Sequence, residues 1–213
     1  MVIARLSTRI LKASPRRPQG LRRGLLAALL VLPFAMATPA AALDAEGAKE
    51  HVAGTVSEML SLVRGPGSAE SKADALRALL EKRAAMPQIA RFSAGRLWKQ
   101  MDAGQQGAFT DAFAHYLSTI YARRFQEYSG QEVVIRTTKE ARRGIEVAST
   151  VEGGGETPIN VVWLISDRPG RTVVADIVIE GVSLLITQRE EIAAIYSQQG
   201  RDADKLIAYL AGV

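Results

Sequence analysis

The chain has 213 residues, a formal net charge of +5, 47% apolar residues and no cysteine. This composition is typical of a globular protein of one or two domains, and it excludes a disordered, collagenous or disulfide-stapled chain. Without cysteine the protein can form no disulfide, no thiolate-bound zinc site and no lipid anchor on an N-terminal cysteine.

The positive charge is confined to the N-terminus. Residues 1–42 contain seven Lys/Arg and no acidic residue, whereas the remaining residues contain 20 Lys/Arg and 22 Asp/Glu. The body of the chain therefore has a net charge of −2. A slightly acidic body argues against a nucleic acid as a partner.

Residues 1–42 have the three parts of a secretory signal peptide. Basic residues end at Arg22-Arg23, an apolar run extends from Leu25 to Ala37, and Pro39-Ala40-Ala41-Ala42 supplies small residues for a signal peptidase. The apolar run has 13 residues, whereas a transmembrane helix needs about 20. We therefore predict cleavage after Ala42, a single domain over residues 43–213 and a periplasmic location. The twin arginines leave open whether export uses the general or the twin-arginine route.

The N-terminal half of the body is predicted to be helical, because its apolar residues recur at three- and four-residue spacing. The first helix starts near Ala45 and ends before Gly65-Pro66-Gly67. Ser71 and Asp74 form a candidate capping box for a second helix, which Pro87 ends. Short helical turns follow over residues 88–101, and then a long helix over about 103–128. Two more helices, 187–198 and 202–211, close the chain, the last with Asp202 as its N-cap.

Between these helical regions the apolar period changes to two, which predicts four strands. They cover residues 132–139, 144–152, 158–167 and 172–179. Their short connections favour hairpins and therefore an antiparallel meander. Helices that precede and follow the strands instead of alternating with them indicate an α+β fold: a twisted four-stranded antiparallel sheet with helices packed on one side.

Alternation places apolar residues over one whole face of this sheet. That face is either ordinary core or, in part, the wall of a cavity for an apolar ligand. The candidate cavity residues are apolar positions of this face and of the long helix: Phe109, Phe113, Leu117, Val147, Val161, Trp163, Ile165, Val173 and Ile177.

Patterns typical of enzymes are weak. His51 and His115 are far apart and have no second histidine at metal-ligand spacing, and Gly153-Gly154-Gly155 precedes a strand, so it is no phosphate-binding loop. Asp176 and Glu180 would be roughly 13 Å apart on a strand, beyond the reach of a glycosidase pair. We predict a protein that is not an enzyme and that needs no metal or cofactor.

A distinctive segment begins within the last predicted strand and continues beyond it. It reads Asp176-Ile177-Val178-Ile179-Glu180-Gly181-Val182-Ser183-Leu184, with Arg189 after it and Asp204-Lys205-Leu206-Ile207 and Leu210 near the end of the chain. The long-helix region contributes Phe92, Gly95, Trp98, Gln106, Phe109, Phe113, Leu117, Tyr121 and Tyr128. In this order the residues resemble the MlaC family, the toluene-tolerance auxiliary proteins of ABC transporters. The family usually has an aromatic residue where this chain has Gln188.

The resemblance implies a periplasmic phospholipid carrier with an NTF2-like cone and an apolar pocket between sheet and helices. Such a carrier moves lipid between an outer-membrane lipoprotein complex and an inner-membrane ABC transporter with an MCE-domain subunit, and so maintains the lipid asymmetry of the outer membrane. We expect a monomer, with phospholipid as the ligand and no cofactor.

Three alternatives stay open. The cargo could be a hopanoid or isoprenoid lipid instead of a phospholipid. The protein could be a small cavity enzyme of the NTF2-like type, which would need a carboxylate or histidine on the apolar face. It could also be a purely structural partner of an envelope complex.

One contact is also predicted. Arg189 opens the helix after the distinctive segment, within reach of the turn at Gly181. We expect it to pair with Asp176 or Glu180 and to fix that helix against the sheet edge. The competing interpretation is that Arg189 holds a lipid phosphate or an acidic patch of a partner.

Overall fold

The structure is a computed structural model, and it describes residues 43–124, 130–153, 157–168 and 170–213. They belong to one compact unit that starts at Ala40. The predicted leader, its cleavage site after Ala42 and the predicted end of the long helix at Tyr128 lie outside the described residues.

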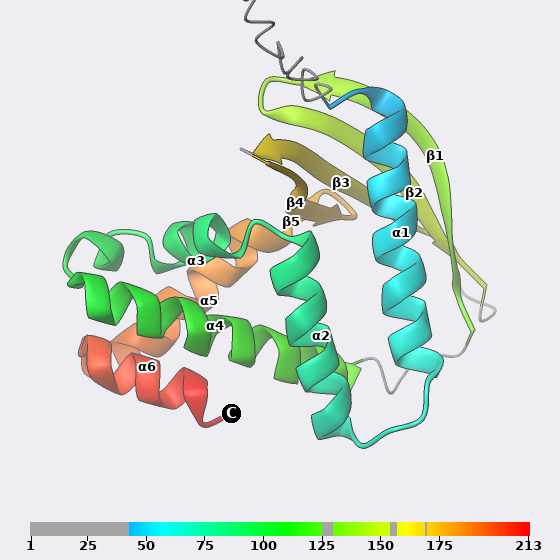
Figure 1. Cartoon of the computed structure of the whole chain (residues 1–213). Coiled ribbons are helices and arrows are strands. Elements are labelled where there is room, and N and C mark those ends of the chain that lie inside the picture. The colour runs from blue at the N-terminus through cyan, green and yellow to red at the C-terminus, as the bar shows by residue number, and fades with distance from the viewer. Residues whose placement is uncertain (1–42, 125–129, 154–156, 169) are drawn as a thin grey trace, which may run out of the picture. The chain divides into compact units, whose positions relative to one another are not determined.

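Helices precede and follow the strands along the chain (Figure 1). Among the described residues, four α-helices and one 3-10 helix precede the strands: α1 (Ala45–Arg64), α2 (Ala69–Arg83), α3 (Met86–Ala94), η1 (Leu97–Lys99) and α4 (Ala103–Arg124). Two α-helices follow them: α5 (Leu184–Gln198) and α6 (Ala203–Ala211). None of the helices in the described ranges combines the length and apolar composition needed to cross a bilayer.

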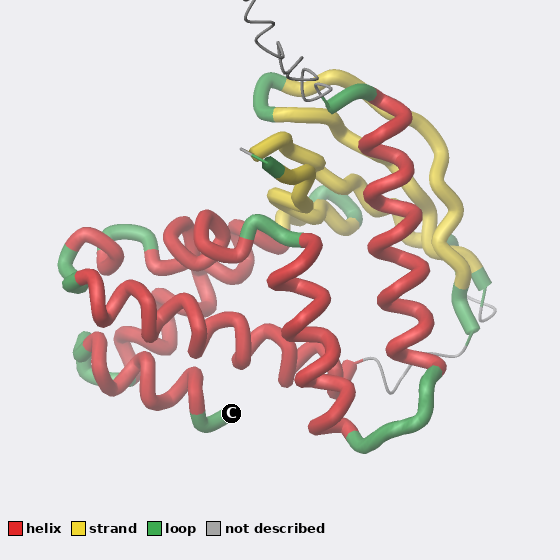
Figure 2. The backbone as a smooth tube through the Cα atoms, in the orientation of Figure 1, coloured by secondary structure: helices red, strands yellow, loops and turns green. Residues whose placement is uncertain are grey.

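The strands form one antiparallel sheet in chain order, β1-β2-β3-β4-β5 (Figure 2). They are β1 (Glu132–Ala141), β2 (Gly144–Glu152), β3 (Ile159–Arg168), β4 (Arg171–Ile179) and β5 (Val182–Ser183). The α+β class and the meander are confirmed. The sequence missed β5, which is too short to show an alternating pattern.

Two side-chain caps and one proline correct the predicted helix boundaries. Ser68, not Ser71, caps α2, because its Oγ accepts a hydrogen bond from the Ser71 amide at 3.2 Å. Pro87 lies in the first turn of α3, where the missing N–H costs nothing, so it starts a helix instead of ending one. Ser183 Oγ accepts from the Ile186 amide, and α5 therefore begins at Leu184. Asp202 caps α6 as predicted.

A bulge in β4 changes which residues share the apolar face of the sheet. The register shifts after Leu164, so that Val174 lies opposite Ile165 and Val173 lies opposite Ser166. Directly opposed residues share a face, and one extra residue reverses the alternation. Val174 therefore joins the apolar face, and the placement of Val173 on it was wrong.

The apolar face packs against the helices in one main core. Buried residues of α1, α3, α4, α5 and α6 join those of β2, β3 and β4 in this cluster. Within α4 the Phe109 and Phe113 rings stack at 5.7 Å, and Trp98 meets Phe109 edge-on at 6.4 Å. A smaller cluster links α2 to the C-terminal part of α4.

Candidate functional site

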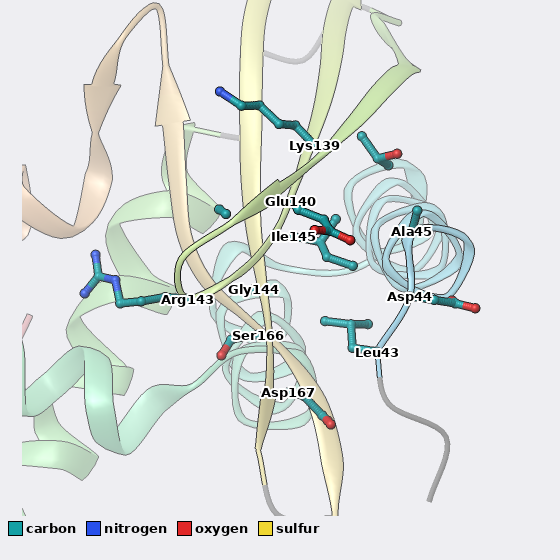
Figure 3. A pocket seen from close by; sticks show the side chains of 12 residues that line it. Leu43, Asp44, Ala45, Lys139, Glu140, Arg143, Gly144, Ile145, Ser166 and Asp167 are labelled. Atoms are coloured by element: carbon teal, nitrogen blue, oxygen red, sulfur yellow. The ribbon is translucent and has the colours of Figure 1, made fainter.

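Three cavities lie between α1 and the β1 side of the sheet, which we call the α1–β1 seam. The C-terminal cavity has a volume of about 330 Å³ and is lined by Ala53, Val56, Ser57, Leu60, Ser61, Arg64, Val133 and Ile135. The middle cavity, about 320 Å³, is lined by Glu46, Lys49, Glu50, Ala53, Ile135 and Arg136. The N-terminal cavity, about 710 Å³, is lined by Leu43, Asp44, Ala45, residues 138–141, residues 143–145, Ser166 and Asp167 (Figure 3).

The cavities follow one another along the seam. The C-terminal and middle cavities share Ala53 and Ile135, so they are neighbours. Advancing along α1 from Ala45 to Arg64 corresponds to moving backwards along β1, from Ala141 to Val133. The 20 residues of α1 correspond to a length of about 30 Å. The seam is therefore about as long as this helix.

Chemical character changes along the seam. In the C-terminal cavity Val56 and Leu60 of α1 face Val133 and Ile135 of β1, and polar atoms come from Ser57, Ser61 and Arg64. The middle and N-terminal cavities contain charged side chains of both signs. Only the C-terminal cavity therefore suits a hydrocarbon chain along most of its wall.

Helix α1, the outer wall of the seam, is fastened to α2 by a cluster of polar contacts. Glu58 forms ion pairs with Arg83 and, at 3.0 Å, with Lys82. Hydrogen bonds from Arg83 and then Lys82 lower the pKa of Glu58 to about 2. His51 Nε2 lies 3.2 Å from the Arg83 carbonyl oxygen, and burial lowers the pKa of this imidazole.

The nine residues predicted to line a cavity are mostly in the core. Phe109, Phe113 and Leu117 of α4 are buried, as are Val147, Val161, Trp163 and Ile165 of the sheet; Ile177 is half-buried, and Val173 is buried on the other face. Strand pairing brings Val147, Trp163 and Ile177 side by side. None of the nine is among the residues that line the three seam cavities of the described part of the chain.

A polar residue lies within the apolar face. Trp163 Nε1 donates a hydrogen bond of 2.9 Å to Ser149 Oγ, which donates in turn to the Val161 carbonyl at 3.3 Å. Ser149 is 2% exposed, so this pair satisfies the indole N–H where water is excluded. Ser149 is not among the residues predicted for this face, since only apolar positions carry the alternating pattern.

The seam residues Val56, Leu60, Val133 and Ile135 were also missed as site residues. Their apolar periodicity correctly predicted a helix and a strand. Periodicity gives the face on which a residue lies but not whether the opposing element fills the space in front of it. No signal in the sequence separates these four residues from ordinary core.

The distinctive segment runs from the end of β4 to the start of α5 and joins the sheet to that helix. Asp176 Oδ1 accepts hydrogen bonds from the Ile177 and Leu185 amides at 2.8 and 3.1 Å, and Oδ2 accepts from Ser183 Oγ at 2.6 Å. This carboxylate thus satisfies an amide at the start of α5 that has no partner within the helix. Glu180 and Gly181 have φ of 47° and 82° and form the two-residue turn between β4 and β5.

The predicted ion pair of Arg189 was wrong. Its guanidinium lies 5.1 Å from the centre of the Phe92 ring in a cation–π contact, and among the described residues it forms no ion pair with Asp176 or Glu180. A Cβ at Gly95, where φ is +57°, would lie 3.3 Å from Arg189 Nε. Arg189 therefore fastens α5 to α3 instead of to the sheet, because Asp176 is already occupied by the α5 N-terminus.

The side chain before Arg189 belongs to a polar network. Gln188 is 5% exposed, and its Nε2 donates to Glu191 Oε2 at 3.0 Å. The other oxygen of Glu191 accepts from the Tyr116 hydroxyl at 2.6 Å. Burial and this hydrogen bond raise the pKa of the Tyr116 phenol well above its usual range. The network links α4 to α5, so Gln188 has a structural role in this chain.

Comparisons with known proteins give a family and solved structures with a similar fold. The sequence matches the profile of the family described as "MlaC protein" over residues 53–212, a range that contains every strand. No curated protein matches it. The fold is similar to that of a phospholipid-binding protein from Ralstonia solanacearum, whose structure was determined in complex with a phospholipid. The identity is 25%, the match covers 76% of this chain and 94% of the other, and the TM-score is 0.63.

Proposed function

The chain belongs to the MlaC protein family. We propose that it is a phospholipid carrier and that the acyl chains of the bound lipid enter the protein through the α1–β1 seam. The observation that carries this proposal is the apolar C-terminal cavity, where Val56 and Leu60 face Val133 and Ile135 across a space of about 330 Å³. The phospholipid bound to the Ralstonia solanacearum protein supports the same ligand class.

A carrier of this kind needs shielding from water and no catalysis. Exposing acyl chains to water costs about 0.8 kcal/mol per CH₂, so the roughly 30 groups of two chains make unassisted transfer very slow. An apolar wall along the chains removes most of this cost. We accordingly propose that the protein is not an enzyme.

The C-terminal cavity, at about 330 Å³, is too small for two acyl chains. Pockets for drug-sized ligands already have volumes of about 300–1,000 Å³, and a diacyl phospholipid is larger than such a ligand. We propose that the chains pass from the seam toward the apolar face behind it, where Val147, Val161, Trp163, Ile165 and Ile177 lie. The predicted residues Phe109, Phe113 and Leu117 would close the far side of this space. Val173, on the other face of the sheet, is not part of it.

Family membership and the sequence pattern of residues 1–42 support a proposal for export and partners. We propose that residues 1–42 direct export, that cleavage after Ala42 releases the carrier into the periplasm, and that it acts as a monomer. Its proposed partners are an outer-membrane lipoprotein complex and an inner-membrane ABC transporter with an MCE-domain subunit.

Lipid analysis of the purified protein tests the proposal. The full chain would be expressed in a Gram-negative host, purified without detergent and extracted with organic solvent for mass spectrometry. We expect diacyl phospholipid in near-stoichiometric amount. A polycyclic or isoprenoid lipid would replace the proposed cargo, and an extract without lipid would contradict a carrier altogether.

Adjacent residues of β1 offer a matched pair of variants. Ile135 lines the seam, whereas Val134 lies on the opposite face, and both are half-buried. We expect Ile135→Asp to reduce bound phospholipid at least severalfold, because an unpaired carboxylate in an apolar cavity costs several kcal/mol. Val134→Asp should retain the lipid. Equal lipid contents in the two variants would place the acyl chains elsewhere.

A further inference from the structure

Two hairpin tips meet at one end of the sheet. The β1–β2 turn follows Ala141, which pairs with Gly144, and the β3–β4 turn follows Arg168, which pairs with Arg171. Since β2 pairs with β3 in an antiparallel register from Ile145 and Ile165 onward, both turns lie at the same edge.

A close backbone contact fixes the two tips against each other. Gly144 has a φ of +142°, and a Cβ on it would lie 1.9 Å from the Ile165 carbonyl oxygen. Only glycine permits this approach. Arg171 adds a second anchor, because its Nη2 donates to the Glu81 and Ala84 carbonyls at 3.0 and 2.8 Å. The tips therefore present their side chains from a rigid base.

These tips are basic although the body of the chain is slightly acidic. Positions 139–143 and 167–171 carry five Lys/Arg and two Asp/Glu. Apart from the anchored Arg171, the cations are Lys139, Arg142, Arg143 and Arg168, which we call the basic tips. All four are exposed, and within the described ranges none of them is in an ion pair.

The basic tips adjoin the largest cavity of the seam. Lys139 and Arg143 are among the residues that line the N-terminal cavity, together with Leu43 and Ile145. In Figure 3 the Lys139 and Arg143 side chains point away from α1, whereas Glu140 points toward it. These two cations are thus directed outward at the end of the seam, and Glu140 is directed inward.

We propose that the basic tips bind an anionic lipid surface and so place the end of the α1–β1 seam against a membrane. This inference rests on the proposed function. A guanidinium group binds two oxygens of one phosphate at once. Each Lys or Arg near an anionic lipid surface strengthens binding by roughly the same amount, so the contributions of several cations add. The contact sets the orientation in which a lipid would pass between membrane and carrier.

The composition of the tips favours a lipid surface over an acidic protein. A specific protein interface has an apolar centre with a polar rim. The large apolar side chains that are exposed among the described residues are Ile159, Val182, Ile186 and Tyr209, and none of them belongs to the tips. The tips expose four cations and the two acids Glu140 and Asp167. Such a polar surface with a net positive charge suits a layer of anionic lipid headgroups, which requires no apolar complement.

Vesicle sedimentation with two double variants tests the inference. Arg142 and Arg168 line none of the three seam cavities, so Arg142→Gln/Arg168→Gln leaves the proposed lipid site intact. The control Arg96→Gln/Lys99→Gln removes the same charge from exposed residues of η1 and its flank. Vesicles would be equimolar phosphatidylglycerol and phosphatidylcholine, or phosphatidylcholine alone. Intact mass would show that all proteins carry the same processed N-terminus.

We expect the unmodified protein and the control to bind the anionic vesicles, less strongly at high salt, and not the neutral ones. Loss of two cations should weaken binding about 25-fold, with bound phospholipid unchanged. The inference would be overturned if the unmodified protein did not bind anionic vesicles, which is the result expected if an acidic protein is the partner. It would also be overturned if the tip variant bound them as strongly as the unmodified protein, or if the control variant lost as much vesicle binding as the tip variant. Failure of the proposed function is distinguishable, because the purified protein would then contain no phospholipid.

Discussion

At the scale of single residues, Asp176 has the greatest structural importance in the segment that resembles the MlaC family. Its two oxygens accept hydrogen bonds from two amides and one hydroxyl, on both sides of the β4–β5 turn. One carboxylate therefore fixes the direction in which α5 leaves the sheet. No other residue type of this length offers two charged acceptors.

Replacing Asp176 should weaken the fold. Asp176→Asn keeps the size but turns one acceptor into a donor facing the Leu185 amide or the Ser183 hydroxyl. We expect a loss of about 1–3 kcal/mol of unfolding free energy, measured by urea denaturation. Glu190→Gln removes the same charge from an exposed site on α5 and serves as the control. Equal stabilities of the two variants would argue against the role of Asp176.

His51 gives a pH dependence whose sign follows from its environment. Burial lowers the pKa of the folded-state imidazole below the value of 6.5 for an exposed histidine. The unfolded chain therefore binds the proton more readily, and stability present above about pH 6.5 is lost as the pH falls. We expect the melting temperature to drop between pH 7.5 and 5.5, and to drop less in His51→Gln. Parallel pH profiles would exclude His51 as the cause.

At the scale of elements, the sequence predicts well what depends on local pattern. The positions of α1, α4 and the four long strands, the meander and the cap of α6 all follow from apolar period and turn residues. The sequence does not predict features that depend on contacts between elements, such as the face of a strand residue or the partner of a charged side chain. The bulge after Leu164 changes the face of Val173, and the Asp176 carboxylate is occupied by α5, which leaves Arg189 to pack on Phe92.

The seam itself could not be predicted for a similar reason. Val56 and Ile135 have the pattern of core residues, and the space between them depends on how far α1 lies from β1. That separation is determined by contacts between elements distant in sequence, including the ion pairs of Glu58 with α2. A hydrophobic pattern contains no information on such distances.

Substitution of two glycines by alanine tests the packing around their Cα atoms, one in the sheet and one in a helix. Gly144→Ala would place a Cβ 1.9 Å from the Ile165 carbonyl oxygen at a positive φ, so we expect severe destabilisation or failure to fold. Gly107 lies within α4, and a Cβ added there would have nothing within 4 Å. Gly107→Ala should instead stabilise the protein by about 0.5–1 kcal/mol. Soluble yield and thermal melting would distinguish them, and a normally folded Gly144→Ala protein would refute the contact.

At the scale of the whole molecule, a bound lipid would be part of the folded state. A ligand that binds only the folded protein raises its stability with concentration and affinity. We expect removal of lipid by mild solvent extraction and refolding to lower the melting temperature by about 5–10 °C, and added phospholipid to restore it. Calorimetry of both forms measures this, and coincident melting curves would contradict a lipid held in the core.

The strand order has a consequence for how the chain folds. Every strand pairs with its neighbour in the chain, so the sheet can form by successive local hairpin closures, which are fast. Val56 and Val133, by contrast, line one cavity although 77 positions separate them. Closing that long loop is slower, because more chain entropy is lost before any contact forms. Helix α1 is synthesised before the strands that it covers, and until it docks on them the β1 side of the nascent sheet is open to any lipid in its surroundings.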